Sequence, residues 1–185
     1  MLPAGHYLLG PATGTLQVRT SRAGAYASAG HDLVIEVTRW DATLDVGADA
    51  VTLELTADAH SLEPRWGLNG MSSLTDNDRA SIQRTIDAKV LRGMAIRYHG
   101  RAALAPGRPM VMEGSLTIGL ASRPVRFELR PGSHGRVDAT AKLLQSDFSI
   151  KPYSAMLGAL KVRDALEIVA CARLEARVAA VHAAA

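Results

Sequence analysis

The side chains that could carry out catalysis are few in this chain, and none stands at a diagnostic spacing. Ser133 and His134 are adjacent in Pro-Gly-Ser-His-Gly, where a nucleophile and its base would still need a third group to orient the imidazole. A tight turn between two strands is the simpler explanation of these five residues. The sequence has no Gly-x-Ser-x-Gly elbow and no glycine-rich phosphate loop. We therefore expect a protein that has no catalytic residues, is not an enzyme and uses no cofactor.

Metal binding is not indicated by the sequence either. Asp76-Asn77-Asp78 begins like a calcium loop, but the glycine and the terminal glutamate of that motif are missing, and the first turn of a helix favours acidic residues. The six histidines show no H-x-H or H-x-x-x-H pair, although distant strands could still bring His31 and His99 together. Cys171 is the only cysteine, which excludes an intramolecular disulfide and a multi-cysteine zinc site. We expect no metal site.

The elements that must position any functional side chain are β-strands, because apolar and polar residues alternate in one segment after another. This pattern runs through Leu33–Thr38, Val51–Asp58, Val125–Arg130, Val137–Leu143 and Leu166–Leu174. A period of two places successive side chains on opposite faces, so each run has an apolar stripe that must pack on a partner sheet or close on itself. The pattern predicts an all-β antiparallel barrel or sandwich.

About eight strands are expected, because turn signals separate the alternating runs at the spacing of a meander. The turns fall at Gly47–Ala50, Ala105–Pro109, Gly119–Pro124 and Pro131–Gly135. The strands would cover 15–21, 26–40, 51–62, 94–104, 109–118, 124–130, 136–144 and 162–174. Residues 41–46 would either pair with the strand 26–40 or continue it. The length of 185 residues suits one domain over 1–185, with its core at about 15–174. The Ala-rich tail at about 175–185 would be a frayed helix or disordered.

One stretch is predicted to be helical. Thr75 can cap a helix whose third residue is Asp78, and Ile82, Ile86 and Val90 then recur every four residues on one face until Arg92-Gly93 ends it. We expect this helix to lie across one end of the barrel and to plug it, leaving the other end for entry.

Charge and hydropathy exclude several classes of function. The net charge is +3 with Lys and Arg scattered along the chain, which indicates a solvated surface and no nucleic-acid partner. The N-terminal residues lack the basic and apolar regions of a signal peptide, and no segment approaches the length of a membrane span. We therefore expect a cytoplasmic protein that does not span a membrane and that could form oligomers.

The interior must be filled by small and aliphatic residues, because aromatic residues make up only 4% of the chain. Ala139, Ala141, Ala170 and Ala172 lie on the apparent inner faces of two late strands, where they either leave space for a ligand or allow close packing. The methionines Met94, Met110, Met112 and Met156 either line an adaptable apolar cavity or pack in the core.

The order of several short motifs resembles the YceI-like family. Leu143–Ile168 contains Gln-Ser-Asp-Phe-Ser-Ile between two strands, which is similar to the family's C-terminal signature. Upstream, similar motifs are Gly30-His31-Asp32, Ala59-His60-Ser61-Leu62, Gly114–Ile118 followed by Arg123-Pro124-Val125, and the helix ending in Val90-Leu91. They span roughly residues 15–174. Many relatives carry a signal peptide, and we expect this chain to depart from them there; it also carries Ser149 where relatives often have Gly.

This resemblance implies an extended eight-stranded antiparallel lipocalin-like barrel with one α-helix covering an end, whose lumen binds polyisoprenoids or similar amphiphilic lipids. We expect a long isoprenoid or acyl chain inside the barrel and its polar head at the mouth. The residues expected to line the lumen are Leu33, Ile35, Val37, Ile96, Met110, Met112, Phe127, Phe148 and Leu166. The mouth candidates are His31, Trp40, Trp66 and Tyr153.

Two alternatives remain at this stage. His31, which follows Gly30 and begins a strongly apolar strand, is either a hydrogen-bonded residue at a strand end or part of a polar site at the mouth. The barrel itself could be fully packed and serve as a protein-interaction or stress-related module. Its contact would then be the loop Glu63–Leu74, which contains Trp66 and Met71.

Overall fold

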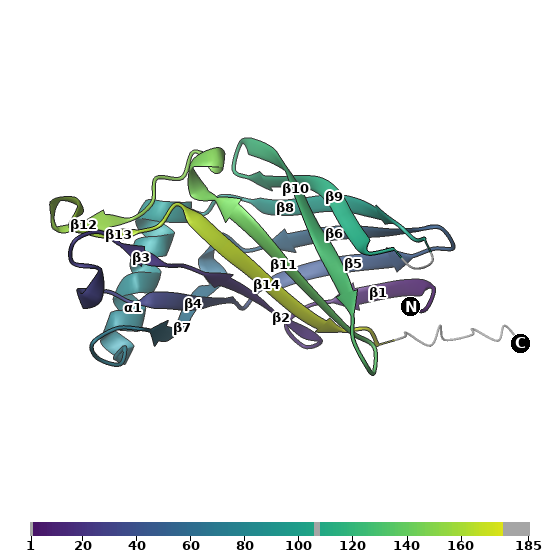
Figure 1. Ribbon diagram of the computed structural model, residues 1–185, viewed down its shortest axis with the longest axis horizontal. Coiled ribbons are helices and arrows are strands. Elements are labelled where there is room, and N and C mark those ends of the chain that lie inside the picture. Colours follow the sequence, from purple (N-terminus) through teal and green to yellow (C-terminus); the bar gives the residue numbers. More distant parts are fainter. Residues whose placement is uncertain (1, 106–107, 176–185) are drawn as a thin grey trace, which may run out of the picture.

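The computed structural model describes residues 2–105 and 108–175, and these form a strongly curled antiparallel sheet, a half-barrel, with a helix on its concave side (Figure 1). Within the described residues the main sheet has 11 strands in the order β1-β5-β6-β8-β9-β10-β11-β14-β2-β4-β7. Their bounds are β1 Gly5–Leu9, β2 Gly14–Arg19, β4 Asp32–Val37, β5 Trp40–Val46, β6 Ala50–Ala57, β7 Leu62–Leu68, β8 Ile96–Ala103, β9 Met110–Ile118, β10 Ala121–Pro131, β11 Arg136–Leu144 and β14 Ala165–Arg173.

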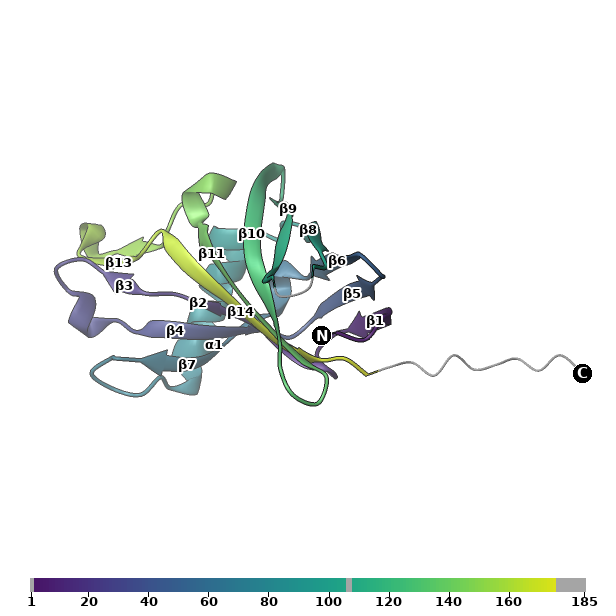
Figure 2. The same ribbon diagram turned by 45° about the vertical axis from the view of Figure 1, so that its right-hand side comes forward.

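The curl of the sheet follows from one long bent hairpin. β4 and β5 lie near opposite ends of the strand order, yet only Thr38 and Arg39 separate them along the chain. Their partners β7 and β6 are likewise separated only by Asp58 and the short 3-10 helix that it caps, Ala59–Ser61. One hairpin therefore pairs with both ends of the sheet, and the sheet must wrap around to reach it (Figure 2).

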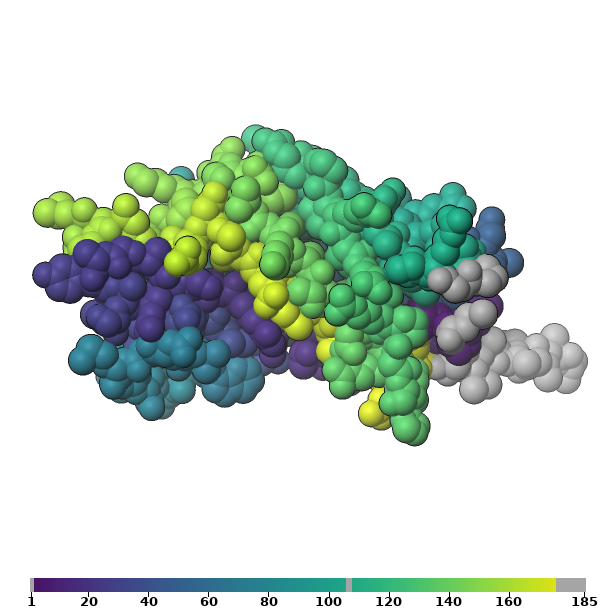
Figure 3. Space-filling view, in the orientation of Figure 1, coloured from purple at the N-terminus to yellow at the C-terminus, as the bar shows by residue number. Residues whose placement is uncertain are grey.

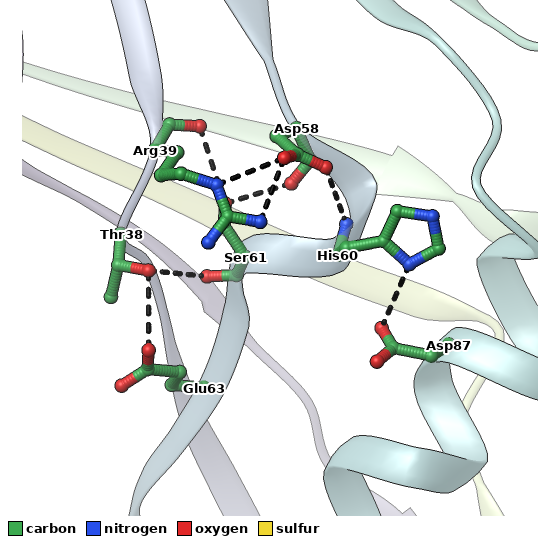
Figure 4. A network of polar contacts seen from close by, with 7 residues as sticks. All are labelled: Thr38, Arg39, Asp58, His60, Ser61, Glu63 and Asp87. Carbon is green, nitrogen blue, oxygen red and sulfur yellow. Dashed lines mark hydrogen bonds and ion pairs between the residues drawn. The ribbon is translucent and has the colours of Figure 1, made fainter.

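The bend in this hairpin is held by a polar network (Figure 4). Ser61 is buried, and its Oγ donates to Asp58 O at 2.7 Å. Thr38 N and Thr38 Oγ1 both donate to Ser61 O, at 2.8 and 3.1 Å. Arg39 pairs with the Asp58 carboxylate at 2.7 Å. These bonds satisfy the backbone groups that the interrupted ladder leaves unpaired, so the strands can change direction without burying orphan donors or acceptors.

The predicted count of about eight strands was wrong because of these bends and because of short strands that carry no clear alternation. The expected strand 51–62 is split into β6, the turn, and the start of β7, while the expected strand 26–40 shrinks to β4. The strands expected from the sequence also included no counterpart of β1 or of the short strands of a second sheet. Part of the predicted turn Ala105–Pro109 lies outside the described residues. The predicted tail at about 175–185 lies almost wholly outside them.

The predicted helix is confirmed. α1 spans Asp76–Thr85, and Thr75 and Asp78 form a complete capping box: Thr75 Oγ1 accepts from Asp78 N at 3.2 Å, and Thr75 N donates to Asp78 Oδ2 at 2.9 Å. The helix continues as a π-helical turn, Ile86–Leu91, and ends where Arg92 adopts a left-handed conformation. The Asp87 carboxylate lies 3.8 Å from His60 Nδ1, which ties this turn to the bend (Figure 4).

A small three-stranded sheet extends one end of the molecule. It has the order β12-β13-β3, with β3 at Arg22–Ala23, β12 at Ser154–Ala155 and β13 at Leu160–Val162. Figure 1 shows it beside the open ends of β4 and β7 and close to α1, far from the turn that joins β5 and β6. Its position makes it part of one rim of the curled sheet.

Replacing Ser61 by Ala should destabilise the bend. The substitution removes a buried hydroxyl that donates to Asp58 O and Arg39 O, while both carbonyls keep their backbone donors, so the free energy of unfolding should fall by about 1 kcal/mol. Urea denaturation measures this. The control is Ser28→Ala, at an exposed position in the turn Ala27–Ala29, which should change stability by less than about 0.5 kcal/mol. Equal stability of the two variants would contradict the role given to the bend.

Candidate functional site

The concave side of the curled sheet encloses a largely apolar cavity of about 680 Å³. Ligand pockets for small molecules span about 300–1,000 Å³, so the volume is ample for a ligand. Side chains from β2, β4, β5, β6, β8, β9, β10, β11 and β14 form its wall, and Ile82, Ile86 and Val90 of the helix face it from the concave side. The helix therefore lines the cavity and does not fill it.

Small residues keep the cavity open. Ala139 of β11 and Ala170 of β14 are direct cross-strand neighbours, and both line the cavity. Ala141 and Ala172 line it as well. Of the two interpretations that the sequence left open for these four alanines, the structure favours the one in which they provide space.

The mouth lies beside the helix. The exposed residues of the lining come from the start of α1, the β7–α1 loop, the β3–β4 connection and the β12–β13 hairpin, and they are Ala29, Ser72, Asp78, Ser81, Tyr153 and Lys161. Away from the mouth, Val51 and Met112 are fully buried in the hydrophobic core and do not line the cavity. The sequence predicted that the helix plugs one end and leaves the other for entry; in the structure its apolar face lines the cavity, and the exposed residues of the lining lie beside it.

His31 connects two rims of this mouth. Its Nε2 donates to Ser72 O at 2.6 Å, and its ring lies where a Cβ on Gly70 or Gly67 would stand, which explains the glycines at the end of β7 and in the loop after it. His31 also lines the cavity. Both interpretations of His31 therefore apply: it is a hydrogen-bonded residue just before β4 and it belongs to the polar rim.

Asp32 and Arg22 complete the polar rim. Burial acts to raise the pKa of the Asp32 carboxyl, but hydrogen bonds from Asn69 and from the backbone of Arg22 outweigh it and hold this pKa below its usual value. The Arg22 guanidinium donates to Gly30 O at 2.8 Å and also to Asn69 O. These bonds fasten the β3–β4 connection to the β7–α1 loop, so the opening has a defined shape.

Nine of the thirteen residues singled out from the sequence line the cavity: His31, Leu33, Ile35, Val37, Trp40, Ile96, Phe127, Tyr153 and Leu166. Their contact with a ligand stays a prediction. Tyr153 lies at the mouth, as expected. Trp40 was expected there too, but it is buried next to the bend, at the start of β5.

The other four residues lie outside the lining, each for a physical reason. Met110 and Met112 are on the inward-facing positions of β9 but belong to the packed end. Phe148 is buried in a 3-10 turn, Gln145–Phe148, where the alternation of a strand no longer applies. Trp66 is half exposed, because a register shift in β7 pairs it with Val34, which faces away from the cavity. Met94 and Met156 do not line the cavity either.

Sequence reasoning missed Tyr98, the residue with the most unusual chemistry in the wall. Tyr98 is buried, lines the cavity and packs against Phe127 with ring centroids 5.4 Å apart. Its hydroxyl lies over Gly100 and Gly114, in space that a Cβ would take, and has no hydrogen-bond partner. The alternation of Ile96, Tyr98, Gly100 and Ala102 could have identified it. Arg22, Ser72 and Lys161 gave no comparable signal.

The residues considered for catalysis or metal binding do not assemble into a site. Ser133 and His134 lie in the exposed turn between β10 and β11. His99 is exposed on β8 beside Glu54, away from His31. Among residues 2–105 and 108–175, no three His, Cys, Asp or Glu side chains are grouped as metal ligands. Burial raises the pKa of the Cys171 thiol.

Comparisons with known proteins agree with the fold and go no further. The chain is similar in structure to Burkholderia cenocepacia BcnA, whose crystal structure superposes with a TM-score of 0.62 at 12% sequence identity, over 88% of this chain and 97% of that one. At this identity the similarity supports a distant lipocalin-like fold relationship alone. No family model and no curated protein matches the sequence.

Replacing Tyr98 by Phe should stabilise the protein, because it removes a buried hydroxyl that has no partner. The expected gain is about 1 kcal/mol. The matched control is Tyr7→Phe, which should cost about 1 kcal/mol, because the buried Tyr7 hydroxyl donates to Pro3 O at 2.9 Å. Urea denaturation of both variants gives the two signs, and a loss of stability in Tyr98→Phe would contradict the assignment.

The same residue predicts a pH dependence at alkaline pH. Burial raises the pKa of Tyr98 from 10.0 to about 12, so the folded state keeps this proton after the unfolded state has lost it. The resulting stabilisation is complete below about pH 10 and disappears as the pH rises towards 12. Tyr98→Phe should reduce this alkaline loss of stability.

Proposed function

We propose that this protein is a non-catalytic carrier that holds the chain of a long isoprenoid, or of a similar amphiphilic lipid, in the cavity of the curled sheet. The observation that carries the proposal is the cavity itself: about 680 Å³ with an aliphatic wall and its polar residues near one opening. This arrangement suits a ligand with a long apolar tail and one polar head. In this proposal the sheet works as a lipocalin-like barrel related to the YceI-like proteins.

Burial of the tail would provide the affinity. Each buried methylene contributes about 0.8 kcal/mol, so one five-carbon prenyl unit contributes roughly 3–4 kcal/mol before the cost of ordering the chain. Two or three such units give useful affinity. Arg22 and Lys161 line the opening and carry N–H groups that can donate to an oxygen-rich head group.

The identity of the ligand can be determined by gentle purification, organic extraction and mass spectrometry. A prenyl or acyl species in near-stoichiometric amount supports the proposal. Absence of any such species, together with no uptake of added isoprenoid alcohols of several lengths, contradicts it.

Filling the cavity from its wall should weaken ligand binding. Ala139→Phe combined with Ala170→Phe places two rings across the space that these alanines leave open. Displacing two methylenes of a bound chain costs about 1.6 kcal/mol, so affinity should fall at least about tenfold. Titration with a fluorescent isoprenoid measures the dissociation constant.

The matched control changes the neighbouring residue on the opposite face of β11. Thr140 is exposed and does not line the cavity, so Thr140→Phe adds a ring on the outside of the same strand. It should leave the dissociation constant within about twofold of that of the original chain. Equal loading by the cavity-filled variant and by this control would refute binding in the cavity.

A second candidate function is protein recognition through β7. The predicted loop Glu63–Leu74 is β7 as far as Leu68, an edge strand of the main sheet, and this corrects the prediction of a loop. An edge strand presents unpaired backbone groups to a partner strand. Trp66, Leu68 and Met71 are exposed along this edge and loop, at 53, 50 and 85%.

Truncating Trp66 separates the two functions. Since Trp66 lies outside the cavity lining, Trp66→Ala should leave isoprenoid affinity within about twofold, whereas a partner bound on β7 should lose at least about tenfold in affinity, as aromatic hot spots do. Isoprenoid titration and co-purification of a partner are the two measurements. A lipid-binding defect in this variant would show that the mouth extends to β7.

A further inference from the structure

The small sheet at the rim of the cavity has an unusual surface. We infer that residues 22–29 and 151–163, here named the docking face, bind the surface of a bilayer that contains anionic phospholipid. This inference goes beyond the proposed function and rests on the exposed apolar side chains and the charge of this face. It concerns the surface from which an apolar ligand would reach the mouth.

Large apolar side chains project from the docking face. Leu157 is fully exposed, at 110%, and Met156, Tyr26 and Tyr153 are 66, 58 and 39% exposed. Met156 and Leu157 adopt left-handed φ angles of 52° and 54°, a conformation that costs energy for residues other than glycine. The β12–β13 turn thus holds two apolar side chains in water on a strained backbone, which favours a role for them outside the folded monomer.

The aromatic residues lie beside this turn. Tyr26 N donates to Ala159 O at 2.9 Å, and Val162 N donates to Tyr153 O at 2.9 Å, so both tyrosines belong to the same rigid patch. Figure 3 shows the β3–β4 connection and the β12–β13 hairpin adjacent at one end of the molecule, on its surface. Tyr is enriched at membrane–water interfaces, where its ring and hydroxyl suit the two environments.

The charge of the docking face is complementary to an anionic surface. Residues 22–29 and 151–163 contain Arg22, Lys151, Lys161 and Arg163, and no Asp or Glu. Asp32, outside this face, interacts with the charges of Arg22 and Arg163, so the two lysines carry most of the complementarity. Lys151 and Lys161 are exposed, and they are two of only four lysines in the chain. Basic residues beside inserted apolar ones are the combination with which peripheral proteins bind anionic membranes.

The docking face is continuous with the mouth of the cavity. Ala29, Tyr153 and Lys161 belong to this face and also line the cavity. A bilayer seated on the docking face would therefore lie against the opening, and an apolar chain could enter without crossing bulk water. This continuity favours a lipid surface over a protein as the occupant.

Co-sedimentation of the full chain with phosphatidylcholine vesicles, with and without phosphatidylglycerol, tests the inference. We expect binding to the anionic vesicles that weakens with added salt. Met156→Asn combined with Leu157→Asn should reduce the partition coefficient at least about tenfold by removing the inserted groups. Asn tolerates the left-handed conformation of both positions, so this variant keeps the turn.

Two matched controls use equally exposed residues elsewhere. Leu120, 105% exposed in the β9–β10 turn, lies off the docking face, and Leu120→Asn should leave partitioning unchanged. Lys151→Gln with Lys161→Gln should weaken binding about fivefold for each lysine, whereas Lys89→Gln with Lys142→Gln should have little effect. No binding of the original chain to anionic vesicles, or equal losses in the paired variants, would overturn the inference.

Hydrogen exchange of the original chain provides a measurement that needs no variant. Vesicles should protect peptides from 22–29 and 151–163, and protection confined to other segments would also overturn the inference.

The cavity-filled variant Ala139→Phe/Ala170→Phe distinguishes the two proposals. If this variant binds vesicles but takes up no isoprenoid, both the carrier function and the docking face are supported. If the original chain binds vesicles but takes up no isoprenoid, only the carrier function is contradicted.

Discussion

The bend of the long hairpin is the constraint on which the rest of the structure depends. Because β4 and β5 are consecutive in the chain but pair near opposite ends of the sheet, the sheet can satisfy its backbone hydrogen bonds only by curling. The bonds of Ser61 with Asp58 and Thr38 make the change of direction possible at a buried position. The concave wall, the place of the helix and the two unlike ends of the cavity all follow from that curl.

Within the curled wall, the size of the inward side chains decides where space remains. Met112 and Val51 are fully buried outside the cavity lining, whereas the cross-strand pair Ala139 and Ala170 of β11 and β14 lines the cavity with small side chains. An empty apolar cavity forfeits dispersion contacts, and the hydroxyl of Tyr98 and the indole nitrogen of Trp40 are buried without partners. The fold thus keeps this volume at a loss of stability, and in the proposed carrier function the apolar tail of the ligand would fill it.

The sequence predicted those parts of the structure that depend on local pattern. Alternation identified the strands whose inward residues line the cavity, and the Thr75–Asp78 capping box fixed the start of the helix. It could not predict the register shift that turns Trp66 outward or the 3-10 turn that removes Phe148 from the wall, because both depend on pairing with distant segments. The β12–β13 hairpin was missed because Met156 and Leu157 have no preference for left-handed backbone.

The position of the mouth connects the carrier function with the docking face. An isoprenoid chain that leaves a bilayer through water exposes its methylenes at a cost of about 0.8 kcal/mol each, which is a kinetic barrier, so a carrier would gain in rate from an opening that faces the lipid phase directly. Lys161 and Tyr153 belong both to the wall of the opening and to the surface that would touch the bilayer. Since His31 and Arg22 fasten the opposite rim through hydrogen bonds to the β7–α1 loop, the opening is held in shape from both sides. Transfer would then require the chain to slide past this rim, with the basic residues there keeping its head group at the membrane surface until the tail is buried.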